Sequence, residues 1–74
     1  MPVGFMLINV QIVGVEKTVK QISKIRGVKK CWRLYGIYDV ITKIDRPDLE
    51  SLKYTSQQIR NHKKVEKTLL MIVV

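Results

Sequence analysis

The first and last segments of this chain both read as β-strands with apolar side chains on two faces. Residues 3–12 are apolar in both alternating sets of positions: Val3, Phe5 and Leu7 in one set, and Met6, Ile8, Val10 and Ile12 in the other. Residues 65–74 repeat this pattern and end in a run of Leu, Met, Ile and Val. Because successive side chains of a strand point to opposite faces of a sheet, each strand needs cover on both faces. The chain is therefore limited to folds that bury a sheet on two sides.

Two amphipathic helices are predicted between these strands. The first ends at Gly27, a residue type suited to the left-handed position after a helix. Its apolar residues recur at helical spacing: Val15, Val19, Ile22 and Ile25. The second is predicted to begin with Asp45 as N-cap and Pro47 in its first turn, and to fray near residues 61–62. Its inward positions are Leu49, Leu52, Ser56 and Ile59. Each helix thus has one face that can pack on a sheet.

Two shorter strands are predicted at residues 28–35 and 38–44, joined by a tight antiparallel hairpin at Gly36. The first of them carries Lys29, Lys30 and Arg33, which is typical of an edge strand. The resulting order is strand, helix, strand, strand, helix, strand. Right-handed crossovers place both helices on one face of the antiparallel sheet. We therefore expect an α+β, ferredoxin-like βαββαβ fold in a single domain, residues 1–74.

A domain of this size has few internal means of stabilising itself. The core of such a domain rarely supplies more than roughly 3 to 5 kcal/mol. The single cysteine, Cys31, has no partner for an intrachain disulfide. Two helices cover one sheet face, yet the first and last strands are apolar on both. We therefore expect identical chains to pack through the uncovered face, with a two-fold dimer as the smallest closed assembly.

The chain carries 14 Lys and Arg against six Asp and Glu, a net charge of +8. This charge attracts polyanions at low salt, so a basic nucleic-acid-binding module and a merely solvated lysine-rich surface are both open. The lone cysteine and the lack of a leader-like segment predict a cytoplasmic location, and no apolar run predicts a membrane partner. One Cys31 and one His62 predict neither a metal site nor a cofactor, and no residue arrangement suggests an enzyme.

The hairpin at residues 35–39 contains the most specific candidate site. Asp39 is the only acid between Glu16 and Asp45, and a carboxylate held on a short turn pairs well with an ammonium group. Gly36 lets backbone N–H groups approach a carboxylate because no Cβ intervenes, and Tyr38 can line a wall. The same residues also fit a plain hairpin in which Asp39 bonds to the turn or to a basic neighbour. Both readings remain open at this point.

These segments, taken in order, resemble the ligand-binding and oligomerisation (RAM) domain of the Lrp/AsnC feast/famine regulators. The similarity rests on residues 22–28, the Gly-x-Tyr-Asp hairpin within 35–41, residues 48–49, and residues 65–68 with their apolar tail. It implies binding of free amino acids at interfaces between dimers. It also implies that Gly36, Tyr38 and Asp39 form part of the pocket and that Thr68 lies near it. Regulators of this family also carry a helix-turn-helix domain, and the chain resembles a stand-alone version without one.

We therefore expect a non-enzymatic, cytoplasmic homo-oligomer that binds free amino acids at subunit interfaces. Its dimers are expected to assemble further into rings or stacks, and to influence transcription through partner regulators. Direct, specific DNA binding is not expected. Two alternatives stay open: a basic nucleic-acid-binding module that uses the lysine-rich helices, and a pure assembly partner of full-length Lrp/AsnC regulators.

Overall fold

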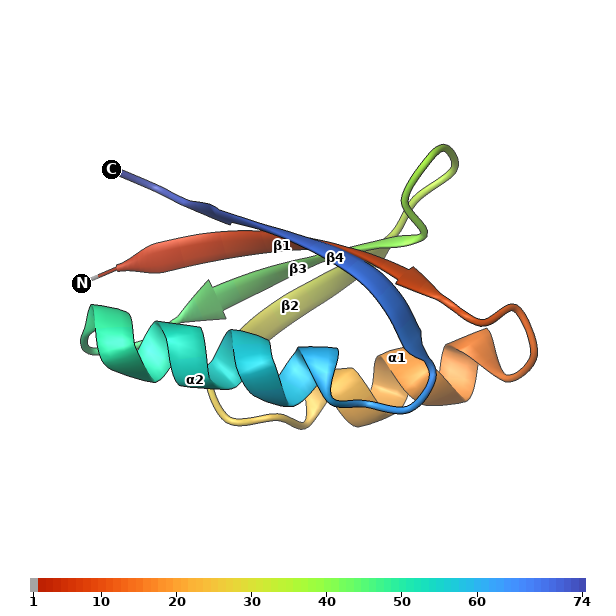
Figure 1. Ribbon diagram of the computed structural model, residues 1–74, viewed down its shortest axis with the longest axis horizontal. Helices are drawn as coiled ribbons and strands as arrows, with labels where there is room; N and C mark the ends of the chain where they lie inside the picture. Colours follow the sequence, from red (N-terminus) through yellow and green to blue (C-terminus); the bar gives the residue numbers. More distant parts are fainter. Residues whose placement is uncertain (1) are drawn as a thin grey trace.

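A four-stranded antiparallel sheet with two helices on one of its faces forms this protein (Figure 1). The computed structural model describes residues 2–74, so Met1 of the predicted domain lies outside the described residues. The elements are β1 (Val3–Val10), α1 (Val15–Ser23), β2 (Val28–Arg33), β3 (Val40–Asp45), α2 (Leu49–Arg60) and β4 (Val65–Ile72). The strands lie in the order β2-β3-β1-β4. This order confirms the ferredoxin-like prediction, with β1 central and β2 at an edge. None of the helices between residues 2 and 74 has the length and apolar character to cross a membrane.

The hydrophobic core lies between the helices and the sheet. Every second residue of β1, from Gly4 to Val10, is buried, and β3 alternates in the same way. The two strands run antiparallel in a register that pairs Ile8 with Val40 and Gly4 with Ile44, so both present one face to the helices. The buried apolar side chains are Met6, Ile8, Val10, Ile22, Val40, Ile44, Leu52 and Ile59.

The opposite face of the sheet has no helix over it (Figure 1). In its centre, Leu7 of β1 lies between Ile41 of β3 and Leu69 of β4. Trp32, Leu69 and Met71 on this face remain between 40% and 46% exposed. A large apolar surface is therefore left in contact with solvent, as expected from strands that are apolar on two faces.

Several predicted element ends differ from the structure. Strand β1 ends at Val10, and Ile12 and Val13 are 89% and 78% exposed in the loop before α1. Helix α1 ends at Ser23 rather than at Gly27, which lies in the following turn with φ +97°. A Cβ at that glycine would collide with the side chain of Arg46. The glycine is thus needed for the turn and for close packing, and not as the residue that directly ends the helix.

The predicted N-cap of the second helix was wrong. Asp48 caps α2, because its Oδ1 accepts the backbone N–H of Ser51 at 2.8 Å. Asp45 is the last residue of β3, where it pairs with Val3 and donates its N–H to the carbonyl of Gly27 at 2.9 Å. Pro47 consequently precedes the cap. The sequence contains two acids three residues apart, and the length of the β1–β3 pairing decides which of them begins the helix.

Replacing Asp48 with Ala should lower the melting temperature at pH 7, because the Ser51 N–H loses its acceptor. That same N–H lowers the pKa of the Asp48 carboxyl below its ordinary value. A lowered pKa means that the stabilisation is present above the unfolded-state value of about 3.9 and is lost as the pH falls through the folded-state value. Thermal unfolding at pH 7, 5 and 3 should show the difference from wild type shrinking in acid.

Asp45→Ala is the matched control for this substitution. It removes the acid that the sequence pattern favoured as N-cap, and no hydrogen bond to its carboxylate is found within residues 2–74. A greater loss of stability from Asp45→Ala than from Asp48→Ala would contradict the assignment of the cap.

Candidate functional site

The loop between β2 and β3 projects beyond the sheet (Figure 1). It is closed by a hydrogen bond of 2.8 Å from the N–H of Leu34 to the carbonyl of Asp39. The connection between the two strands is longer than the predicted tight turn. β2 ends at Arg33 instead of residue 35, and β3 begins at Val40 instead of residue 38. Gly36 has φ +147°, and a Cβ built there meets nothing within 4 Å. Its backbone is thus open to an approaching molecule.

Asp39 is fixed to the central strand by two hydrogen bonds. Its backbone N–H donates to the carbonyl of Ile8 at 3.0 Å, and its Oδ2 accepts the N–H of Val10 at 3.0 Å. The regular β1–β3 pairing ends where Ile8 meets Val40, so the carboxylate replaces a strand carbonyl as partner of Val10. One carboxylate oxygen therefore has a structural role. Within residues 2–74, no donor is hydrogen-bonded to the other oxygen, Oδ1.

The four predicted site residues do not all come together in one protomer. Gly36, Tyr38 and Asp39 share the β2–β3 loop, with Tyr38 and Asp39 half-buried. Thr68 lies on β4, across β1 from the loop, where it pairs with Ile8 on the helix side of the sheet. Its hydroxyl accepts a hydrogen bond of 2.9 Å from Nε of Arg60. Thr68 is thus separated from the loop by the width of the central strand.

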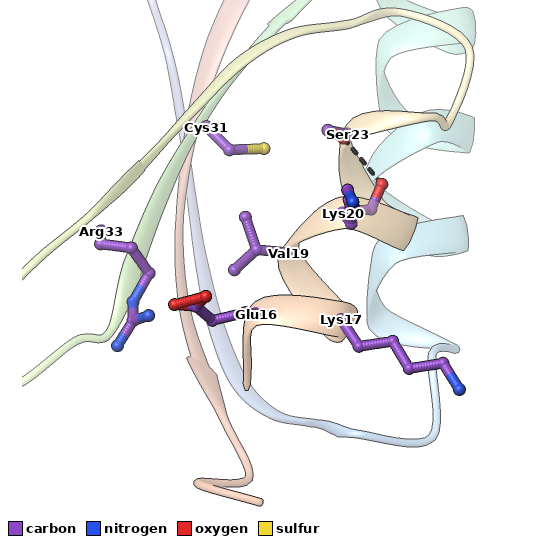
Figure 2. Close-up of a pocket in the computed structure, with 7 residues that line it drawn as sticks. All are labelled: Glu16, Lys17, Val19, Lys20, Ser23, Cys31 and Arg33. Carbon is purple, nitrogen blue, oxygen red and sulfur yellow. Dashed lines mark hydrogen bonds between the residues drawn. The ribbon is translucent and has the colours of Figure 1, made fainter. Parts of the chain in front are cut away.

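A groove between α1 and β2, away from the loop residues 34–39, was not predicted from the sequence (Figure 2). Its volume is about 680 Å³. The groove is lined by Glu16, Lys17, Val19, Lys20, Ser23, Cys31 and Arg33. The sequence showed that the face of β2 with Cys31 and Arg33 is polar-leaning. It did not show that this face points toward α1, and that orientation creates the groove.

Cys31 is a half-buried free thiol on the wall of this groove. Burial raises the pKa of the Cys31 thiol above its ordinary value, and the nearby hydroxyl of Thr42, 3.7 Å from the sulfur, partly offsets the rise. The side chain is therefore a poorly reactive thiol at neutral pH. His62 contacts Gln21 at 2.7 Å, and residues 2–74 contain no group of three His, Cys, Asp or Glu placed to hold a metal ion.

Comparison with known proteins identifies the family. Residues 3–74 match the sequence model of the Lrp/AsnC ligand binding domain. The chain therefore belongs to the Lrp/AsnC family of ligand-binding domains. No curated protein sequence matches the chain at a significant level.

Solved structures share this fold over the full chain. FFRP-DM1 is 24% identical with a TM-score of 0.91, and the match covers 100% of both chains. TTHA0845 from Thermus thermophilus is also 24% identical at a TM-score of 0.91, covering 100% of this chain and 94% of that one. The transcriptional regulator NMB0573 of Neisseria meningitidis, solved as a complex with L-Met, is 16% identical at a TM-score of 0.85. That match covers 99% of this chain and 49% of the regulator.

Asp39→Ala should destabilise the fold by about 1 to 2 kcal/mol, because the Val10 N–H loses a charged acceptor. Asp39→Asn should retain most of the stability, since its amide oxygen still accepts the bond. Urea unfolding of the three proteins measures both differences. Equal losses of stability from Asp39→Ala and Asp39→Asn would contradict the structural role assigned to the hydrogen bond. Because Asp39→Asn is expected to keep the fold stable, it is the variant suited to tests of ligand binding.

Proposed function

We propose that this chain is a non-enzymatic module that binds free amino acids where its subunits meet, and that binding favours the assembled state. The observation that carries the proposal is the geometry of Asp39. Its Oδ2 is held by Val10, which fixes the direction of the carboxylate, while Oδ1 remains for a ligand. A pre-positioned carboxylate loses little freedom when it pairs with an ammonium group.

The neighbouring residues supply the remaining contacts in this proposal. The open backbone at Gly36 is suited to an α-carboxylate, because N–H groups can approach it without a Cβ. The half-buried ring of Tyr38 provides a wall beside Asp39. The solved regulator that contains L-Met supports an amino acid as the class of ligand.

A single protomer does not enclose such a ligand. Tyr35 and Ile37 on the same loop are 106% and 87% exposed, and Thr68 lies on the far side of β1. A second protomer is needed to exclude water from the loop, and it can bring its own Thr68 close. A site that is complete only in the assembly stabilises the assembly by mass action, so the ligand acts as an assembly signal.

The uncovered sheet face supplies the surface for a homodimer in this proposal. The centre of this face is apolar at Leu7, Ile41 and Leu69. Charged residues of the same face lie around this centre: Lys30, Lys43, Asp45 and Lys67. Burying apolar area contributes about 25 cal/mol per Å², which a small core needs. Dimers joined through the ligand loops would then form rings or stacks.

The cellular setting follows from the same proposal. The free thiol of Cys31 suits a reducing cytoplasm. Residues 1–74 act as one ligand-binding and oligomerisation domain, and the module reaches DNA through Lrp/AsnC-type regulators that carry a helix-turn-helix domain. Co-purification from the native host checks for such partners.

Calorimetric titration with free amino acids should detect binding of one or more of them with a Kd between micromolar and millimolar. This range corresponds to a binding free energy of about 4 to 8 kcal/mol in magnitude. Asp39→Asn should weaken binding at least tenfold, because a neutral amide does not neutralise the α-ammonium group. Asp45→Asn, at the other end of β3, is the matched control and should bind as wild type does. If the full set of amino acids gives no heat and no change in sedimentation, the ligand proposal fails.

Sedimentation equilibrium at micromolar concentration should give a mass at least twice the 8.6 kDa of one chain. Leu69→Glu places a charge at the centre of the uncovered face and should yield monomers. The matched control is Tyr54→Glu on α2, where the ring is 65% exposed on the helical side. It should leave the mass unchanged. Wild-type protein that sediments only at 8.6 kDa would overturn the dimer.

A further inference from the structure

The groove between α1 and β2 combines apolar walls with two opposite charges at one end. Val19 and Cys31 face each other across it, and Glu16 and Arg33 reach the same end from the helix and the strand (Figure 2). No hydrogen bond joins the carboxylate to the guanidinium, so the capacity of both groups to bind other partners is retained. Ser23 lies at the other end, with its hydroxyl bonded to the carbonyl of Lys20 at 2.7 Å.

We propose that this groove binds a small 2-hydroxy carboxylate with an apolar side chain, within a single protomer. The site is separate from the β2–β3 loop and goes beyond amino-acid binding at subunit interfaces. Its volume of about 680 Å³ falls within the roughly 300 to 1,000 Å³ of small-molecule sites.

Arg33 selects the carboxylate. A guanidinium offers parallel N–H donors that match the two oxygens of a carboxylate, and it keeps its charge at any physiological pH. Arg33 is the last residue of β2, and its side chain extends away from Cys31 toward Glu16 at one end of the groove (Figure 2).

Glu16 selects a donor on the neighbouring carbon. An ionised carboxylate only accepts hydrogen bonds, so a bare ligand carboxylate beside it would be repelled. A hydroxyl at C2 of the ligand lies next to the ligand carboxylate and can donate to Glu16 while Arg33 holds the acid. The two protein groups together therefore fit a 2-substituted acid better than a simple fatty acid.

The charge of the lining favours a hydroxyl over an ammonium group at C2. The residues that line the groove include Lys17, Lys20 and Arg33 against a single acid, Glu16. Lys17 directs its ammonium group away from Glu16 and Arg33, so it adds to the positive field around the groove and not to the charge inside it (Figure 2). A surplus of positive charge attracts a monoanion from solution toward the groove. A zwitterionic amino acid has no net charge and is not attracted in this way. The half-buried Val19 and Cys31 then cover a branched or aromatic side chain of the ligand.

Cys31 provides a reporter for the test, because it is the only cysteine in the chain. The rate of its alkylation by iodoacetamide at alkaline pH is measured with racemic 2-hydroxy-4-methylpentanoate, L-leucine or 4-methylpentanoate present. The hydroxy acid should bind at about 0.1 to 10 mM, and at ten times its Kd it should slow alkylation about tenfold. Leucine and 4-methylpentanoate should each protect at least threefold less at the same concentration.

Variants locate the protection in the groove. Arg33→Gln should raise the Kd of the hydroxy acid at least tenfold, whereas Lys30→Gln removes the same charge from the other face of the same strand and should change it less than twofold. Asp39→Asn should leave protection unchanged, which distinguishes this site from the loop. All variants are first matched for melting temperature.

Three results would overturn the proposal. If none of the probes protects Cys31 from alkylation, the groove is not a binding site for them. If leucine or 4-methylpentanoate protects Cys31 as well as the hydroxy acid does, or better, the proposed class of ligand is wrong. Equal effects of Arg33→Gln and Lys30→Gln would show a general charge effect rather than a contact in the groove.

Discussion

The pairing of β1 on both of its edges is the constraint from which the other features follow. Ile8 shows this directly: its side chain is fully buried under the helices, and its neighbours across the sheet are Val40 on β3 and Thr68 on β4. Its carbonyl accepts the N–H of Asp39. The core, the sheet order and the position of the candidate carboxylate are thus fixed by one strand. The side chains of any strand alternate between the two faces of its sheet, and in β1 both sets are mainly apolar.

The architecture was predictable because it depends on periodicity, which a sequence displays. The ends of elements were not, because they depend on which contacts neighbouring strands complete. Asp45 and Asp48 are both acceptable caps by local chemistry, and the pairing of Asp45 with Val3 decides between them. In the same way, the β2–β3 turn looked tight at Gly36, yet the strands stop pairing before it and the loop widens.

The candidate site was predictable only where its residues are close together in the sequence. Gly36, Tyr38 and Asp39 lie close in sequence and stay close in the fold, while Thr68 was added through resemblance and lies across β1. The plain-hairpin interpretation expected Asp39 to bond to the turn or to a basic neighbour, whereas its carboxylate accepts the N–H of Val10 on β1. One carboxylate oxygen holds Val10, and this bond orients the other. In the proposed site, this structural hydrogen bond would pre-organise the carboxylate for a ligand rather than compete with it.

The edge position of β2 explains why both candidate sites lie along that strand. The helix-facing residues of β1 and β3 are buried, which leaves no room for a ligand beneath the sheet centre. β2 has a neighbour on one side only, and α1 covers it incompletely, so Cys31 and Arg33 line a groove. Immediately after Arg33 the chain leaves the sheet and forms the exposed loop. An edge strand that is too polar to complete the core thereby becomes the part of the fold with surface left for recognition.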